Sequence, residues 1–282
     1  SLRTAACAAR RADVAVVVAG HTYRDEGEKM PWVGGDRKSL RLSHHDEALI
    51  RAAAEANPRT VVVLMGGGPI ICEAWRHQVA AVVMAWYPGM EGGHAIADVL
   101  LGRVNPSAKL PCVWPADESH LPPFDNTSDE VEYGYYHGYR LLDKNGHAPA
   151  FPFGFGLSYT TYAYGDLQLA HDVVSPDGVL AVSVDVTNTG DVAGDEIVQL
   201  YVGYEGSAVD RPVKELKGFA RVSLQPGETK TVRLSLPVRS LAYWDDATTR
   251  WVVEEIGYRV QVGPSAVDTG GSAEFRVQSA AR

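Results

Sequence analysis

Short apolar runs rich in β-branched residues alternate with segments of helical spacing over the first 115 residues. Four apolar runs predict strands at 12–20, 60–65, 80–86 and 112–114. Three segments with apolar residues every three or four positions predict helices at 1–11, 43–56 and 94–101. Strands that alternate with helices favour a mostly parallel sheet with helices on both faces. We therefore predict an α/β sandwich domain over residues 1–115.

The pattern changes twice after this region. Residues 116–161 are rich in Pro, Asp and Tyr, and we predict an extended linker or arm there. From residue 162 onward, short segments alternate apolar and polar positions, which predicts strands at 180–187, 196–202, 214–222, 230–236 and 258–262. We predict an all-β immunoglobulin-like sandwich over 162–282, of the fibronectin type III-like variety because a Cys…Trp…Cys set is missing from the sequence.

The long connection from Gly20 to Arg37 follows the first predicted strand. Loops at the carboxyl ends of parallel strands are where α/β proteins usually place their chemistry. This loop contains three acidic residues, Asp25, Glu26 and Glu28, and the aromatic residues Tyr23 and Trp32. One of the carboxyl groups could act as a general acid or base, with a pKa raised by burial beside Trp32 or another carboxylate. A solvated run of charges is the equally weighted alternative.

Other residues near predicted strand ends have structural interpretations as well. We expect Asp36 and Arg37 to form an ion pair that pins the end of the long loop. Glu91 could bind a ligand hydroxyl, or it could cap the amides of its own glycine-rich loop.

The triple glycine 66–68 follows a predicted strand, as in a phosphate-binding loop. No Gly-Lys-Ser/Thr follows it, and Pro69 lacks an amide proton. We therefore favour close backbone packing over nucleotide binding at this turn.

The amino-acid composition limits the classes of molecule that this chain could bind. The formal net charge of −9, without a basic stripe, argues against nucleic acid, and no apolar run is long enough to span a bilayer. The three cysteines are far apart and no Cys/His spacing resembles a metal site, so we expect no disulfide framework, metal or cofactor. A reducing, cytoplasmic location is favoured. Secretion stays open because the chain begins abruptly, without Met, and reads as part of a longer polypeptide.

An ordered set of motifs resembles one enzyme family. The motifs are DEGE at 25–28, GDRKSL at 35–40, ANPRTVVVL at 56–64, AWYPGMEGG at 85–93, ADVLLG at 97–102, NPSAKLP at 105–111 and FGFGLSYT at 153–160. Each motif is weak alone, but together and in this order they look like the C-terminal half of a glycoside hydrolase family 3 enzyme of the β-glucosidase type. The resemblance covers nearly the whole chain.

The resemblance implies a retaining hydrolase of terminal β-D-glycosides, chiefly β-glucosides, built from a barrel, an α/β sandwich domain and a fibronectin type III-like domain. In this family an Asp of the barrel is the nucleophile, and this chain has no counterpart of it. Glu26 is the implied acid/base, with Glu28 as the alternate. Tyr23, Trp32 and Glu91 are our candidates for substrate binding.

The expected partners are a carbohydrate and a barrel domain or chain, and a homo-oligomer is left open. The alternative is a non-catalytic carbohydrate-binding or assembly module, which the missing nucleophile motivates.

Overall fold

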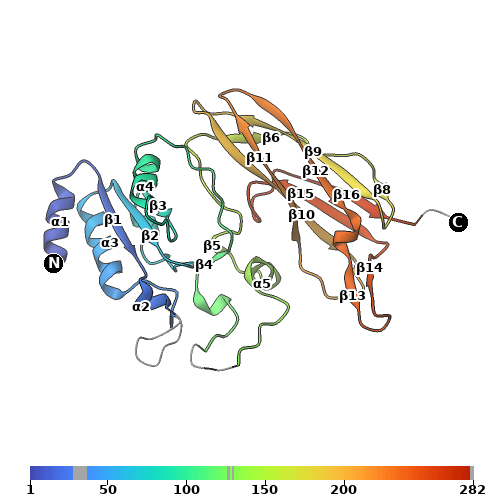
Figure 1. Ribbon diagram of the computed structural model, residues 1–282, viewed down its shortest axis with the longest axis horizontal. Coiled ribbons are helices and arrows are strands. Elements are labelled where there is room, and N and C mark those ends of the chain that lie inside the picture. Colours follow the sequence, from blue (N-terminus) through green and yellow to red (C-terminus); the bar gives the residue numbers. More distant parts are fainter. Residues whose placement is uncertain (28–36, 126–127, 129, 280–282) are drawn as a thin grey trace. The chain divides into compact units, whose positions relative to one another are not determined.

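The computed structural model describes residues 1–27, 37–125, 128 and 130–279 (Figure 1). The chain forms two compact units whose segments interleave along the sequence. The first unit consists of Ser1–Arg103, Trp114–Tyr135 and Ala148–Phe151. The second unit consists of Val104–Val113, Tyr136–His147 and Pro152–Arg282.

A three-stranded parallel sheet organises the first unit. Its strands are β1 (Ala15–Gly20), β2 (Thr60–Met65) and β3 (Ala81–Met84), in the order β1-β2-β3. Helix α3 (His44–Ala56) packs on β1 and β2 and also contacts α1 (Leu2–Arg10). The remaining elements of this unit are α2 (Tyr23–Glu26), η1 (Arg76–Gln78), α4 (Gly92–Leu100), β4 (Trp114–Pro115), η2 (Glu118–His120) and β5 (Pro149–Phe151). The three parallel strands and the helices α1, α3 and α4 were predicted from the sequence, whereas α2 lies in a segment predicted as a loop.

Strand β1 buries only one of its faces. Val17 and Ala19 are buried, whereas Val16 and Val18 are 49% and 60% exposed. The apolar run from Val14 to Ala19 is typical of a buried parallel strand, and in the described chain only one face of it is buried. Strand β1 lies at the edge of the sheet, so β2 is its partner on one side only.

The predicted strand at 112–114 does not join the parallel sheet. The structure has β4 instead, and Trp114 pairs antiparallel with Phe151 of β5. The Trp114 and Phe151 rings pack edge to face with centroids 5.7 Å apart, and the Arg76 guanidinium lies over the Phe151 ring. The apolar run is too short for its direction to be read from the sequence, and Phe151 lies far from it along the chain.

Two larger sheets, mostly antiparallel, build the second unit. One has the order β11-β10-β15-β16-β8, in which β16 and β8 run parallel, and the other has the order β12-β9-β6, with β7 also pairing with β9. Their strands are β6 (Tyr162–Tyr164), β7 (Gln168–Leu169), β8 (Val173–Val174), β9 (Val179–Asn188), β10 (Gly194–Glu205), β11 (Glu215–Leu224), β12 (Thr229–Pro237), β15 (Gly257–Gly263) and β16 (Gly271–Val277).

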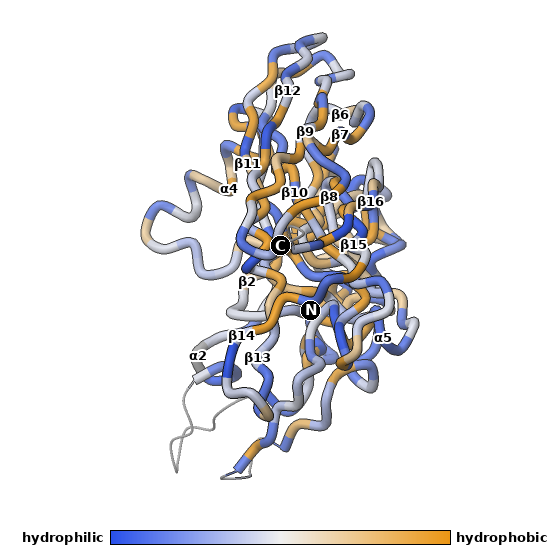
Figure 2. The backbone as a smooth tube through the Cα atoms, turned by 90° about the vertical axis from the view of Figure 1, so that its right-hand side faces the viewer, coloured by the Kyte–Doolittle hydropathy of each residue, from blue (hydrophilic) through white to orange (hydrophobic). Residues whose placement is uncertain are grey.

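Alternation of apolar and polar residues forms the core of the second unit. Along β9, Leu180, Val182, Val184 and Val186 are buried while the residues between them are less buried. They join one cluster with apolar side chains of β10, β12, β15 and β16. The hydrophobic stretches of these strands are visible in Figure 2. Outside the sheets, the unit contains η3 (Val238–Leu241) and the hairpin of β13 (Tyr243–Asp245) and β14 (Arg250–Val252).

The segment predicted as an extended arm contains a helix. Helix α5 (Gly138–Asn145) ends at Gly146, whose φ of 68° is the left-handed C-cap that glycine favours. Tyr139 on this helix stacks on Phe153 with ring centroids 5.0 Å apart, and Leu142 is buried. The helix is short and lies in a Pro- and Tyr-rich segment, so its apolar spacing could not be recognised from the sequence.

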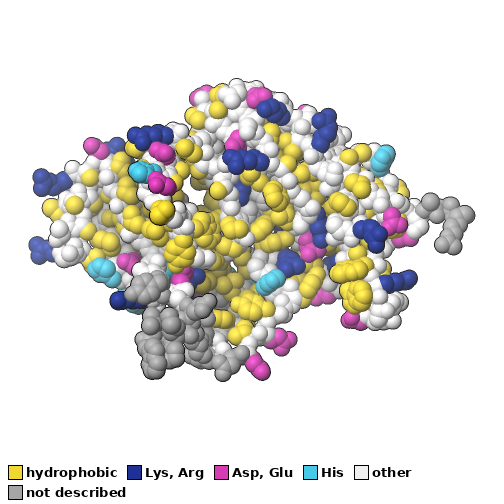
Figure 3. Space-filling view, viewed as in Figure 1, with side chains coloured by type: hydrophobic (Ala, Val, Ile, Leu, Met, Phe, Trp, Pro, Cys, Tyr) yellow, Lys and Arg dark blue, Asp and Glu magenta, His cyan; other side chains and the backbone are white. Residues whose placement is uncertain are grey.

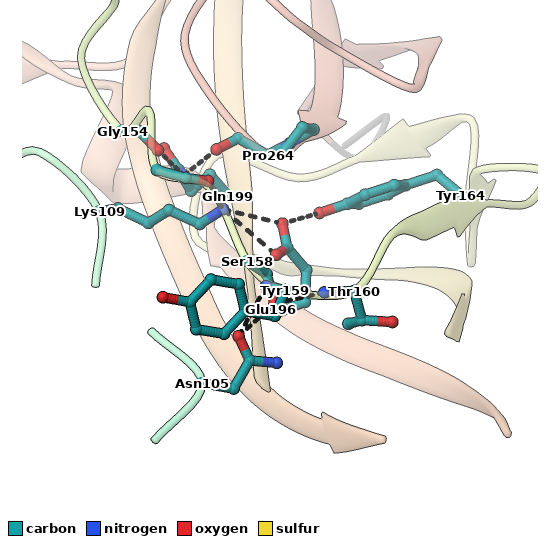
Figure 4. Close-up of polar contacts among 11 residues, drawn as sticks. Asn105, Lys109, Gly154, Ser158, Tyr159, Thr160, Tyr164, Glu196, Gln199 and Pro264 are labelled. Carbon is teal, nitrogen blue, oxygen red and sulfur yellow. Dashed lines mark hydrogen bonds and ion pairs between the residues drawn. The ribbon is translucent and has the colours of Figure 1, made fainter. Parts of the chain in front are cut away.

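A partly buried polar cluster explains two of the sequence motifs (Figure 4). The ammonium group of Lys109 lies 3.2 Å from Oε2 of Glu196, and the Tyr164 hydroxyl donates to the other oxygen of the same carboxylate. Asn105 Oδ1 accepts hydrogen bonds from the Ser158 hydroxyl and the Tyr159 amide. The motifs at 105–111 and 153–160 therefore fix their own segments to strand β10 and to each other.

No helix within the described ranges has both the length and the apolar character needed to cross a bilayer.

Candidate functional site

The short helix α2 places the acidic residues of the loop after β1. Thr22 is its N-cap and forms a capping box with Asp25. One carboxylate oxygen of Asp25 accepts hydrogen bonds from the amide and the hydroxyl of Thr22, each 2.8 Å long. The hydrogen bond from the Thr22 amide is the main reason that the pKa of Asp25 is lowered. Asp25 thus stabilises the start of the helix, and Glu26 at the helix end is left for another role.

Glu26 is held by three different groups rather than by solvent. Its Oε2 accepts a hydrogen bond of 2.6 Å from the Gly67 amide and another from the Tyr87 hydroxyl. Its Oε1 lies 3.0 Å from Nε of Arg37. Only 12% of the Glu26 side chain is exposed. Glu26 is therefore not part of a solvated run of charges.

The triple glycine after β2 makes room for this carboxylate. A Cβ atom on Gly67 would lie 3.2 Å from Oε2 of Glu26 and 3.3 Å from Cε2 of Tyr87. A Cβ atom on Gly68 would lie 2.7 Å from Nη2 of Arg37. The close packing predicted for these glycines is present. Nothing in the sequence indicated that these glycines pack against Glu26 itself.

Arg37 links the carboxylate to the same turn. Its Nη1 donates a hydrogen bond of 3.0 Å to the carbonyl oxygen of Pro69, and its side chain is 13% exposed. We predicted Asp36 as its ion-pair partner, and Asp36 lies outside the described residues. The partner seen in the structure is Glu26.

Tyr87 approaches Glu26 from the end of β3. Its hydroxyl donates to the carboxylate, and this hydrogen bond is the main cause that raises the pKa of Tyr87 to about 12. The preceding residue, Trp86, has a φ of 55°, a conformation that is uncommon for a non-glycine residue. The Trp86 carbonyl accepts a hydrogen bond from the Gly66 amide. The strained backbone at Trp86 directs Tyr87 toward the glycine turn.

His21 is a member of this cluster that the sequence analysis did not identify. Its amide donates to the Met65 carbonyl, and its ring lies beside Gly66. Burial, followed by the positive charge of Arg37, lowers the pKa of His21. Its Nε2 is buried and has no hydrogen-bond partner among the described residues. Its position directly after β1 was the one available signal.

Of the four other residues predicted for the site, two are described by the structure and two are not. Glu91 is 84% exposed, contacts His94 Nδ1 at 2.7 Å and makes no capping hydrogen bond to α4. Glu28 and Trp32 lie outside the described residues. Tyr23 begins α2, next to Thr22. Among the residues that the structure describes, no group of three His, Cys, Asp or Glu side chains could hold a metal ion.

The site gathers side chains and amides at the carboxyl ends of all three parallel strands. His21 follows β1, the glycine turn follows β2 and Tyr87 lies shortly after β3. Glu26 is a carboxylate of fixed orientation with both a cation and a phenol at hydrogen-bond distance. Such a group can hold and transfer a proton at a defined position.

The fold and this site define an α/β domain with a positioned carboxylate, followed by a mostly antiparallel β domain. Residues 1–159 match the glycosyl hydrolase family 3 C-terminal domain, and residues 196–266 match the fibronectin type III-like domain. The chain belongs to glycosyl hydrolase family 3 and represents a C-terminal part of its members.

Relatives of known name are longer than this chain. It is 43% identical over 277 residues to thermostable beta-glucosidase B of Acetivibrio thermocellus, covering 96% of this chain and 36% of that protein. The crystal structure of the beta-glucosidase from Kluyveromyces marxianus in complex with glucose matches with a TM-score of 0.89 and 42% identity, over 99% of this chain and 33% of that one. DesR, a beta-glucosidase from Streptomyces venezuelae, matches with a TM-score of 0.87 and 37% identity, over 98% and 35% of the two chains. The chain thus spans about a third of the length of these relatives.

Proposed function

We propose that this chain supplies the acid/base carboxyl group, Glu26, for the retaining hydrolysis of terminal β-D-glucosides. The observation that carries the proposal is the fixed orientation of the Glu26 carboxylate on the glycine turn after β2. The names of the relatives support the substrate class, because they are beta-glucosidases. Glu28 is the alternate position and lies outside the described residues.

Retaining hydrolysis requires a second carboxyl group. The two groups stand about 5–5.5 Å apart, and one attacks the anomeric carbon while the other protonates the leaving oxygen. We propose that the nucleophile is an Asp of a barrel domain or chain outside these 282 residues. The length of the relatives supports this division, because the chain covers only 36% of the Acetivibrio thermocellus enzyme. We also propose that the first unit has the α/β sandwich architecture of the family. The second unit has its immunoglobulin-like architecture in this proposal.

The groups around Glu26 fit both halves of the reaction. In the first step Glu26 gives its proton to the glycosidic oxygen as the nucleophile attacks, and in the second step it takes a proton from the attacking water. Arg37 and the Gly67 amide hold the two carboxylate oxygens in place when Glu26 acts as the base of the second step. Tyr87 serves either form because a hydroxyl group both donates and accepts hydrogen bonds. The phenol donates to the carboxylate and accepts from the carboxylic acid.

The test compares Glu26→Gln with Asp25→Asn and Glu28→Gln in the complete enzyme. We expect Glu26→Gln to lower kcat/KM on cellobiose by about 10²- to 10⁴-fold, because the alcohol leaving group needs a proton. The loss should be much smaller on 2,4-dinitrophenyl β-glucoside, whose leaving group departs without one, and azide should restore turnover to Glu26→Gly. Asp25→Asn should retain activity.

Near-normal hydrolysis of cellobiose by Glu26→Gln would reject the assignment. If Glu28→Gln then showed the selective loss, the role would pass to Glu28. If neither variant lost activity, the alternative of a non-catalytic carbohydrate-binding or assembly module would be favoured.

A further inference from the structure

Two tryptophan side chains are displayed on the β13–β14 hairpin of the second unit. Trp244 and Trp251 are directly opposite each other across the hairpin, with ring centroids 5.7 Å apart and planes at 71°. Their exposed fractions are 47% and 66%. Figure 3 shows hydrophobic side chains gathered over this hairpin, which Figure 1 labels. A contiguous exposed aromatic surface of this kind is a candidate interaction site.

Buried groups hold this hairpin in a fixed position. The Arg211 guanidinium lies over the rings of Tyr204 and Tyr243, 4.4 and 5.1 Å from their centroids. It donates to the carbonyl oxygen of Leu241, just before β13, and pairs at 3.5 Å with Glu254, just after β14. The Arg211 and Glu254 side chains are 7% and 8% exposed. Both ends of the hairpin are therefore anchored, and the two indoles are presented by a rigid support.

A hollow of about 500 Å³ lies beside Trp251. It is lined by Pro176, Asp177, Arg239, Ser240, Ala242, Trp251 and Val253. Its volume is in the range of small-molecule sites, which combine apolar walls with a few polar groups. Nη1 of Arg239 and Oδ1 of Asp177 are 3.8 Å apart, and their side chains are 76% and 85% exposed. Both charged groups are thus accessible to a ligand in the hollow.

The chemistry of this hollow favours a neutral ligand with many hydroxyl groups. The carboxylate of Asp177 only accepts hydrogen bonds and the guanidinium of Arg239 only donates them, so a hydroxyl group can satisfy either. Their opposite charges compensate each other, which disfavours a strongly charged ligand. The flat apolar faces of the indoles suit the apolar faces of pyranose rings.

We propose that Trp244, Trp251 and the adjoining hollow form a binding site for a β-linked glucose oligosaccharide. The choice of β-linked glucose rests on the function proposed above, whereas the site itself rests on the hairpin and the hollow. The site lies entirely within the second unit and uses none of the residues around Glu26. It would hold carbohydrate without cleaving it.

The experiment is a titration of the ¹⁵N-labelled full chain with cellopentaose, followed by nuclear magnetic resonance. The chain has six tryptophans, and each gives one indole N–H signal. We expect the signals of Trp244 and Trp251 to shift, while the buried Trp75 and Trp114 serve as internal references that stay in place. Calorimetry should give at least a tenfold weaker affinity for Trp251→Ala and an intermediate one for Trp251→Phe.

A matched control is Phe219→Ala, which removes another exposed aromatic ring of the same unit outside the hollow. It should bind cellopentaose like the wild type. In the complete enzyme, Glu26→Gln should lose hydrolysis but keep these indole shifts, and Trp251→Ala should keep hydrolysis of an aryl β-glucoside. The proposal for Glu26 and the proposal for the hairpin site can therefore be rejected independently of each other.

Three results would overturn the inference. The first is the absence of indole shifts at about 10 mM cellopentaose, a concentration that reveals even millimolar binding. The second is a response to a proline-rich peptide with none to the sugar, which would assign the aromatic surface to a protein partner. The third is indole shifts that depend on protein concentration alone, which would assign it to a second copy of the chain.

Discussion

The amide nitrogen of Gly67 lies 2.6 Å from Oε2 of Glu26, although the two residues are 41 positions apart in the sequence. The backbone after β2 therefore positions the candidate acid/base at the end of α2. Because the donor belongs to the main chain, no side-chain rotation can withdraw it. The Tyr87 hydroxyl reaches the same oxygen from the end of β3, so two strands of the sheet contribute to the orientation of one carboxylate.

Gly67→Ala tests whether this orientation matters. The new methyl group would lie 3.2 Å from Oε2 of Glu26 and should displace the carboxylate. We expect kcat of the complete enzyme to fall by about 10- to 100-fold, because small displacements of catalytic groups are costly. Gly93→Ala is the matched control, since its Cβ would meet nothing within 4 Å and should add helix stability to α4. Unchanged kcat for Gly67→Ala would contradict the role of the turn.

The ionisation of Tyr87 reports directly on its contact with Glu26. The carboxylate disfavours the phenolate, which raises the pKa of Tyr87 to about 12. This contact stabilises the fold below pH 10 and its contribution is lost as the pH rises through about 12. In Glu26→Gln we expect the pKa of Tyr87 to fall toward 10, measured by ¹³C resonance of labelled tyrosine. Tyr136→Phe, which alters a tyrosine of the second unit, should leave the Tyr87 titration unchanged. An unaltered Tyr87 titration in Glu26→Gln would show that the hydrogen bond is not formed.

His21 predicts a loss of stability in mild acid. Burial lowers the pKa of His21 below 6.5, so the folded chain binds a proton less readily than the unfolded chain. The stability is fully present above pH 6.5 and falls as the pH drops below it, by at most about 1.4 kcal/mol per pH unit. In urea unfolding between pH 7 and 5, His21→Gln should flatten this dependence. His94→Gln, whose side chain is 88% exposed in the wild type, should leave it unchanged. Equal slopes for wild type and His21→Gln would exclude His21 as the cause.

The buried pair of Lys109 and Glu196 gives a prediction for the second unit. The two side chains are 12% and 3% exposed, so Lys109→Met leaves a buried carboxylate without its cation. We expect a loss of about 3–5 kcal/mol in the free energy of unfolding. Adding Glu196→Gln should recover part of that loss, because the uncompensated charge disappears. The control Lys230→Met removes a surface pair with Glu228 and should cost at most about 1 kcal/mol. Additive losses in the double variant would contradict the coupling.

Local signals in the sequence were sufficient for many elements. Strand β2 has the predicted bounds, 60–65, because its β-branched residues lie between Pro58 and a glycine turn. Helix α3 begins after Ser43, within one residue of the predicted bound, and the Ser43 hydroxyl accepts a hydrogen bond from the Asp46 amide. The strict alternation in β9 likewise matches one buried face. In each case the deciding residues are close together along the chain.

The features that sequence reasoning missed depend on distant partners. Helix α5 is stabilised by contacts such as that of Tyr139 with Phe153, and β4 depends on Phe151. Glu26 was identified as a candidate carboxylate, but nothing in its neighbourhood indicated Tyr87, which is 61 positions away. The role of Glu26 in proton transfer is still a prediction. The structure adds the groups that would orient it.

The one-sided burial of β1 predicts how the polypeptide behaves in concentrated solution. Val16 and Val18 face outward on a strand whose outer edge lacks a hydrogen-bonding neighbour in the described chain. Such an edge invites two molecules to associate as they are concentrated. We expect the 282-residue polypeptide, expressed by itself, to oligomerise or precipitate above a threshold concentration. Val16→Lys or Val18→Lys should raise that concentration threshold, which light scattering would measure.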